Sequence, residues 1–187
     1  MKRRAFSWRA RAGMTLVETL AAVLMVVLLT TMVAAGMAAA VRVRAQSSFI
    51  SGSQQVADTI GAALSDVLRY ATDVETDGED MVSAFTNVNY GITAGRIYVD
   101  TGDEAGDQGV IYLNAPGAAK KIPLLTNPGY SGLAVVSEDF DSNDDSIGGP
   151  FALRYSDGVF FGTYRLYDSA GGKLSEPIEF TFRALNG

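Results

Sequence analysis

The 187-residue chain contains neither cysteine nor histidine. Without cysteine it cannot form a disulfide, so exported loops would have to be held by packing, hydrogen bonds or a bound ion. Without histidine, Ser-His-Asp and Cys-His catalysis and histidine-ligated zinc are excluded within one chain. The acidic residues are scattered through predicted loops, which is typical of a solvated surface. We therefore expect no enzymatic activity.

Proline is scarce, and the first one in the chain is Pro116. Because proline is the residue that most sharply kinks a helix, a proline kink is excluded from any helix before that position. Gly36 is then the candidate for local bending, with close packing of a neighbouring helix as the alternative role.

Positive charge is confined largely to one end. Residues 1–13 hold five basic residues and no acid, whereas the whole chain has a net charge of −6. Removing that segment leaves 10 basic and 21 acidic residues, a net charge of −11. This sign disfavours general binding to the phosphates of nucleic acids.

A long apolar run follows the basic segment. Leu20–Val41 is 22 residues without a charge, and an α-helix of that length covers about 33 Å, the thickness of a bilayer core. The basic flank places the N-terminus in the cytoplasm by the positive-inside rule. The sequence therefore predicts a single-pass inner-membrane protein whose remaining residues are exported.

A single carboxylate, Glu18, lies where this run begins. A charge at the centre of a membrane helix costs about 2.5–3.5 kcal/mol, so an ionisable residue here is a functional candidate. Its neighbours form a recognisable pattern: a short basic leader, a glycine, an apolar residue, a threonine, two aliphatic residues and the acid. The segment reads Arg11-Ala12-Gly13-Met14-Thr15-Leu16-Val17-Glu18.

This pattern resembles the prepilin processing site of type IV pilins and type II secretion pseudopilins. The resemblance implies that a prepilin peptidase cleaves after Gly13 and methylates the new amine of Met14. Glu18, the fifth residue after the cut, would then face the Met14 amine of another subunit and fix the register of a filament. Met14 departs from the commoner phenylalanine, and the motif covers only about the first 40 residues.

The resemblance implies a structural subunit of a type IV pilus or pseudopilus, assembled through its N-terminal helix. Its implied partners are other pilin subunits, the prepilin peptidase, the assembly platform, the motor ATPase and membrane lipid. The head would leave the membrane in an extracellular or periplasmic filament. Adhesion, twitching, secretion and DNA uptake share this N-terminal chemistry, so the machine is left open.

Other interpretations of the N-terminus stay open. Ala38-Ala39-Ala40 offers a signal-peptidase site before Val41, and Arg3-Arg4 offers a twin-arginine signal. A plain signal anchor, with Glu18 incidental, is a further alternative. In these cases the exported part is an anchored or secreted module that binds an extracellular ligand.

The helix is expected to continue past the membrane. Apolar residues recur at helical spacing on one face after residue 53 and predict an amphipathic half: Val56, Ile60, Leu64, Val67, Leu68 and Ala71. One helix from about Met14 to Tyr70 is the simplest interpretation. The predicted organisation is a leader at 1–13, a membrane and filament-core helix at 14–41, its amphipathic continuation at 42–72, and a β-rich head at 73–187.

After a polar linker at 72–80, short β-rich runs alternate with turn residues. The runs are Phe85–Tyr90, Arg96–Asp100, Val110–Asn114, Leu133–Ser137, Phe151–Tyr155, Val159–Tyr167 and Pro177–Ala184. Asp157-Gly158 predicts one hairpin turn, and residues 95–100 and 109–114 predict a second hairpin. The expected fold class is α+β: a long N-terminal helix packed on a C-terminal antiparallel sheet.

One acidic segment, residues 138–149, is a candidate calcium loop. Its alternating oxygen ligands are Asp139, Asp141, Asn143 and Asp145. An EF-hand is rejected, because Asp144 stands at the glycine position and Pro150 at the final glutamate position. A different calcium geometry, as in some pseudopilins, and a solvated loop with no cofactor are the two alternatives.

Overall fold

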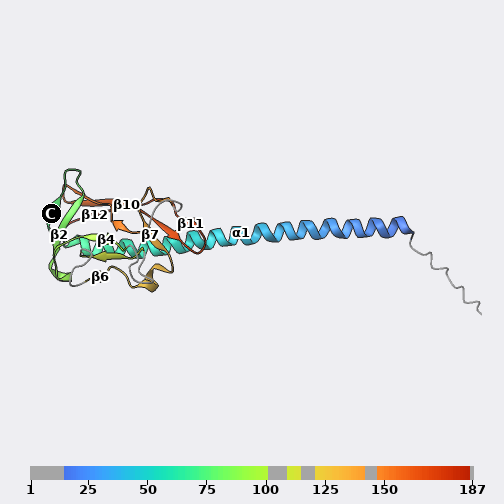
Figure 1. Cartoon of the computed structure of the whole chain (residues 1–187), viewed down its shortest axis with the longest axis horizontal. Helices are drawn as coiled ribbons and strands as arrows, with labels where there is room; N and C mark the ends of the chain where they lie inside the picture. Colours follow the sequence, from blue (N-terminus) through green and yellow to red (C-terminus); the bar gives the residue numbers. More distant parts are fainter. Residues whose placement is uncertain (1–14, 101–108, 115–120, 142–146, 186–187) are drawn as a thin grey trace, which may run out of the picture. The chain divides into compact units, whose positions relative to one another are not determined.

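The computed structural model describes residues 15–100, 109–114, 121–141 and 147–185. Within them, one long helix is followed by antiparallel strands, which is the expected α+β class (Figure 1). Helix α1, Leu16–Arg69, is 54 residues long. The chain divides into two compact units, residues 1–47 and residues 48–187, so the first part of α1 belongs to one unit and its last part to the other.

The strands of the second unit form three antiparallel sheets. The first contains β1 (Thr72–Thr76), β2 (Val82–Asn87) and β3 (Ile92–Gly95). The second has the order β6 (Ile122–Pro123), β5 (Ile111–Leu113), β4 (Ile97–Val99) and β8 (Gly149–Pro150). The third is built around β10 (Val159–Asp168), which pairs with β7 (Ala134–Val136), β9 (Leu153–Ser156), β11 (Lys173–Leu174) and β12 (Ile178–Arg183). Two short 3₁₀ helices, η1 (Val88–Tyr90) and η2 (Asn127–Tyr130), lie between strands.

Both predicted hairpins are confirmed. β9 pairs with β10 across Asp157 and Gly158, whose φ angles of 51° and 78° are those of a type I′ turn. β4 pairs with β5, with Tyr98 opposite Tyr112. The loop that joins β4 to β5 lies outside the described residues.

Two local predictions are wrong. The expected linker at 72–80 begins with strand β1, which pairs with β2 even though its own sequence is polar and acidic. The expected strand Phe85–Tyr90 ends at Asn87, where the chain turns into η1. The buried Asn87 side chain causes this turn: its Oδ1 accepts hydrogen bonds from the backbone of Asn89 and Tyr90, and its Nδ2 donates to the carbonyl of Val67 at 2.6 Å.

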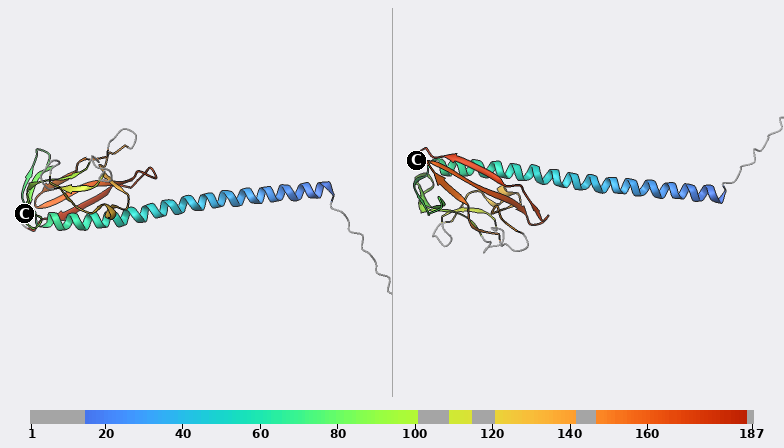
Figure 2. Two further views of the ribbon diagram at one scale, coloured as in Figure 1. Left: turned by 60° about the horizontal axis from the view of Figure 1, so that its bottom comes forward. Right: turned by 90° about the horizontal axis from the view of Figure 1, so that it is seen from above.

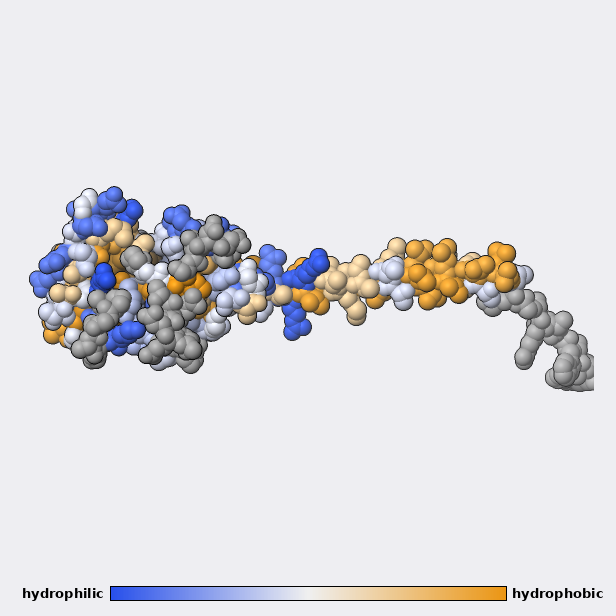
Figure 3. All heavy atoms as spheres, viewed as in Figure 1, coloured by the Kyte–Doolittle hydropathy of each residue, from blue (hydrophilic) through white to orange (hydrophobic). Residues whose placement is uncertain are grey.

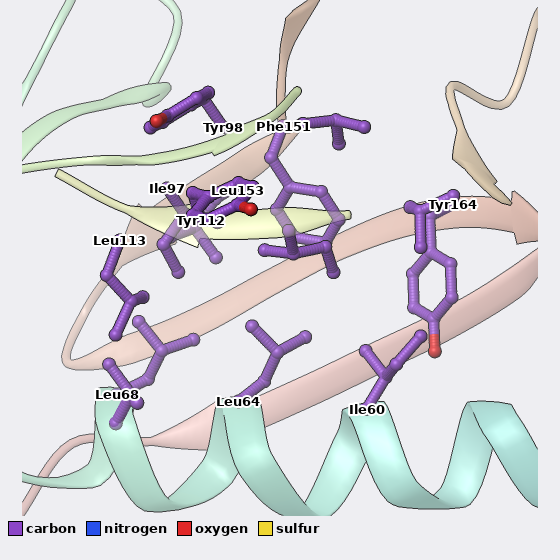
Figure 4. Packing of buried hydrophobic residues seen from close by; sticks show 14 of the residues in the cluster. Ile60, Leu64, Leu68, Ile97, Tyr98, Tyr112, Leu113, Phe151, Leu153 and Tyr164 are labelled. Atoms are coloured by element: carbon purple, nitrogen blue, oxygen red, sulfur yellow. The ribbon is translucent and has the colours of Figure 1, made fainter. Parts of the chain in front are cut away.

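The amphipathic stripe is confirmed as the helical part of the core. Each of its residues is at most 3% exposed, from Val56 to Ala71. Figure 4 shows Ile60, Leu64 and Leu68 pointing from the helix toward strand side chains that include Ile97, Leu113 and Leu153. In both views of Figure 2 the strands lie along the last turns of α1. The hydroxyl of Tyr164 reaches across this layer to the helix carbonyl of Ala57 at 3.4 Å.

Candidate functional site

The candidate processing and assembly site lies at the start of α1. Gly13 and Met14 fall outside the described residues, and the first described residue is Thr15. The carbonyl of Thr15 accepts backbone hydrogen bonds from Glu18 at 3.0 Å and Thr19 at 3.1 Å. Its side-chain oxygen lies 3.3 Å from the Glu18 nitrogen, which donates to it. Thr15 therefore caps the helix and satisfies an amide that would otherwise have no partner in the first turn.

The order Thr15-x-x-Glu18 is that of a capping box. Sequence analysis overlooked this signal, although the spacing of the two residues was sufficient to predict it. The cap fixes α1 to begin at Leu16, two residues after Met14, the predicted new terminus. Glu18 then lies in the first turn of the helix, where the helix dipole favours a negative charge.

The Glu18 side chain is exposed and has no hydrogen bond or ion pair with another described side chain. The next basic residue along the helix is Arg42, 24 positions later. No cation of the described helix therefore lies within reach of the Glu18 carboxylate.

The helix beyond Glu18 is apolar around its whole circumference. The large hydrophobic side chains between Leu16 and Val43 are all between 49% and 78% exposed. Figure 3 shows the hydrophobic colours gathered along this part of α1. A helix that is apolar on every face needs an apolar environment, and this one is long and apolar enough to cross a membrane.

The polar side chains within this segment are satisfied by the helix itself. The Thr30 hydroxyl donates to the carbonyls of Val26 and Val27, at 2.7 and 2.9 Å. The Thr31 hydroxyl donates to Leu28 at 2.8 Å. These internal hydrogen bonds remove the need for water, as a hydrocarbon environment requires.

The candidate calcium loop is described in part. Asp139 and Asp141 are exposed, whereas Asn143 and Asp145 lie outside the described residues. Phe140, between the two aspartates, is buried and packs its ring 5.1 Å from that of Tyr167. It belongs to a small second core with Ala134, Val136 and Ile147. Among the described residues no group of three acidic side chains comes together as a metal site.

A polar cluster that sequence analysis did not single out lies on the sheet of β4, β5 and β6. The Lys121 ammonium is 3.0 Å from the carboxylate of Asp100, which is buried, and 5.5 Å from the centre of the Tyr112 ring. The hydrogen bond to Asp100 raises the pKa of Lys121. Tyr98 stacks on Tyr112, with 5.8 Å between ring centroids. Burial raises the pKa of the Tyr98 hydroxyl.

Comparison with known proteins gives no assignment for any of these features: no family model, curated protein or solved structure matches the chain.

Proposed function

We propose that this protein is a prepilin-like subunit: a membrane-anchored precursor that is cleaved after Gly13 and assembled through α1 into a type IV pilus or pseudopilus. In this proposal the acidic Glu18 of one copy pairs with the Met14 amine of another. The N-terminus is cytoplasmic and the head is exported. The implied partners are other subunits, a prepilin peptidase, an assembly platform with its motor ATPase, and membrane lipid.

The observation that carries the proposal is an uncompensated carboxylate in the first turn of a helix that is exposed and apolar on every face. Cleavage after Gly13 creates a cation four residues before Glu18, and each charge reduces the cost of placing the other in an apolar environment. The Thr15 cap supports the proposal as well, because the helix begins two residues after the new terminus. A filament of packed helices also gives the exposed apolar surface of residues 16–41 an apolar environment.

The identity of the mature N-terminus tests the proposal. Mass spectrometry of the protein purified from its own membranes should find a chain that begins at a methylated Met14. A chain that begins at Val41 would indicate a secreted module that binds a ligand, and an intact Met1 would indicate a plain signal anchor.

A matched pair of variants tests the role of Gly13. Gly13→Leu should block cleavage, because a large side chain prevents close approach of the peptidase to the backbone. Ala12→Leu introduces the same side chain one position earlier and should be processed as in the wild type. Immunoblots of membranes separate precursor from mature chain, and normal processing of Gly13→Leu would refute this role.

A further inference from the structure

Helix α1 carries six charged side chains, three acidic and three basic: Glu18, Arg42, Arg44, Asp58, Asp66 and Arg69. Three of them have evident roles. Glu18 is the proposed assembly residue that fixes the filament register, and Asp66 accepts a hydrogen bond from the Tyr90 hydroxyl at 2.5 Å. Arg69 lies in the last turn, where a cation complements the helix dipole.

The other three charges have no partner within the described chain. Arg42, Arg44 and Asp58 are exposed, and none of them makes a hydrogen bond or ion pair through its side chain with another described residue. Residues i and i+2 of a helix are about 200° apart, so Arg42 and Arg44 point to nearly opposite sides of α1. A neighbouring molecule on either side of the helix therefore meets a guanidinium group.

The position of the two arginines has a cost. They directly follow the apolar run, on the side that the positive-inside rule assigns to the exported part. There they reduce the charge asymmetry that orients the helix. We therefore look for a function of Arg42 and Arg44 outside the membrane, such as binding a negatively charged partner.

The part of the chain after the two arginines supplies the complementary charge. Residues 45–187 contain 20 acidic and eight basic residues, a net charge of −12. Asp58 lies on the polar face of the amphipathic half of α1, away from the buried Val56, Ile60 and Leu64. When copies associate through their helices, Asp58 is the unpaired carboxylate that the amphipathic half of α1 presents to its neighbours.

We propose that Arg42 and Arg44 are ion-pairing sites for neighbouring copies of this chain, one on each side of α1, with Asp58 on the helix of each neighbour as the carboxylate partner. The inference rests on the proposed function, because it needs copies packed side by side. Arginine suits this contact, since its planar guanidinium binds a carboxylate through two parallel hydrogen bonds. The strongly acidic head favours a second copy over an anionic membrane surface, which would repel it.

Reversing the charges of the arginines and of Asp58, singly and together, tests the proposed ion pairs. Arg42→Glu, Arg44→Glu and Asp58→Arg are each expected to lower the yield of sheared filaments at least tenfold. Asp58→Arg combined with Arg42→Glu or with Arg44→Glu should raise the yield again, because the ion pair on that side of the helix is rebuilt with reversed polarity. Glu176→Arg, which makes the same charge change at an exposed loop residue of the head, is the matched control and should assemble normally.

The outcomes separate this inference from the proposed function. Wild-type chains without a methylated Met14 terminus would overturn the proposed function and the pairing with it. Processed chains in which the single variants assemble normally, or in which neither exchange restores filaments, would overturn the pairing alone. If the arginine variants also lose binding to vesicles of anionic lipid and no exchange restores assembly, the two arginines bind lipid instead.

Discussion

At the scale of single residues, the Tyr98 side chain combines burial with an unmet hydrogen bond. The residue is 4% exposed, and its hydroxyl has no hydrogen-bond partner among the described groups. Figure 4 shows the ring on the opposite side of β4 from the helix. A buried polar atom without a partner costs about 1–3 kcal/mol. The stacked contact with Tyr112 does not need the hydroxyl.

Tyr98→Phe should therefore leave stability unchanged or raise it, because the ring contact is kept and the buried hydroxyl is removed. Thermal unfolding of the detergent-solubilised chain, followed by circular dichroism, measures the effect. Tyr112→Leu serves as the comparison, since it removes the stacked ring and should lower the midpoint. A clear loss of stability in Tyr98→Phe would show that the hydroxyl has a partner.

Two other buried tyrosines, Tyr130 and Tyr164, make the stability of the core depend on pH. Burial raises the pKa of Tyr130 to about 12, and its hydroxyl oxygen accepts a hydrogen bond from the backbone of Ile111 at 3.0 Å. Burial, with smaller contributions from Tyr130 and Asp58, raises the pKa of Tyr164 well above 10. Both groups stay protonated in the folded protein at a pH that ionises them in the unfolded chain.

The protein should consequently lose stability in alkali. The contribution of Tyr130 is fully present below its unfolded pKa of about 10 and is lost as the pH rises from 10 to 12, a loss of about 3 kcal/mol for two pKa units. Unfolding midpoints measured between pH 8 and 12 should fall from pH 10 onward. Tyr130→Phe should make that fall less steep, whereas equal steepness in both proteins would contradict this assignment.

At the scale of elements, strand β10 organises the third sheet. It is ten residues long and pairs with four other strands along its two edges. At Gly162 the strand lies between β9 and β12, and a Cβ atom there would collide with the Ala152 carbonyl and with the Phe180 ring. A side chain at this position is excluded by its neighbours on both sides.

Gly162→Ala should destabilise the head by about 1–3 kcal/mol, the usual cost of overpacking a core. Gly78→Ala is the matched control, because a Cβ atom at Gly78 has open space around it. Thermal unfolding of both variants gives the comparison. Equal midpoints for the two would mean that β9 and β12 can move apart without cost.

Elements with local sequence signals could be predicted, whereas elements held by long-range contacts could not. The helix and the two hairpins were predictable because their signals are local: helical spacing of apolar residues, and Asp-Gly at a tight turn. Strand β1 was not predictable, since its polar sequence is held by pairing with β2. The Asn87 side chain that forms the turn into η1 is held in place by a hydrogen bond to the carbonyl of Val67, 20 residues earlier in the chain, and no local pattern reveals that contact.

The candidate site was predicted unevenly for the same reason. Glu18 could be identified because one charge beside a long apolar run is visible in the sequence alone. The Asp100–Lys121 pair joins residues 21 positions apart, one directly after β4 and the other directly before β6, so it could be found only once the pairing of the sheet was known. The calcium loop stays a prediction, with Asp139 and Asp141 described as exposed and Asn143 and Asp145 outside the described residues.

At the scale of the whole molecule, charge and apolar surface are divided between the two units. The first unit contains an exposed apolar helix with Glu18 near its start. The second has its own core and, with 20 acidic residues, nearly all of the negative charge of the chain. We infer that the first unit carries out assembly and that the second is the part presented outside the membrane.

The central claim is that Glu18 is neutralised by the Met14 amine of a neighbouring copy. The most direct test is the yield of sheared filaments from cells that express Glu18→Gln, which keeps the shape of the side chain and removes its charge. The account predicts a mature, membrane-held chain with a methylated Met14 and a filament yield at least tenfold below wild type, and Glu18→Ala should behave alike. Filaments of ordinary length at wild-type yield from either variant would contradict it.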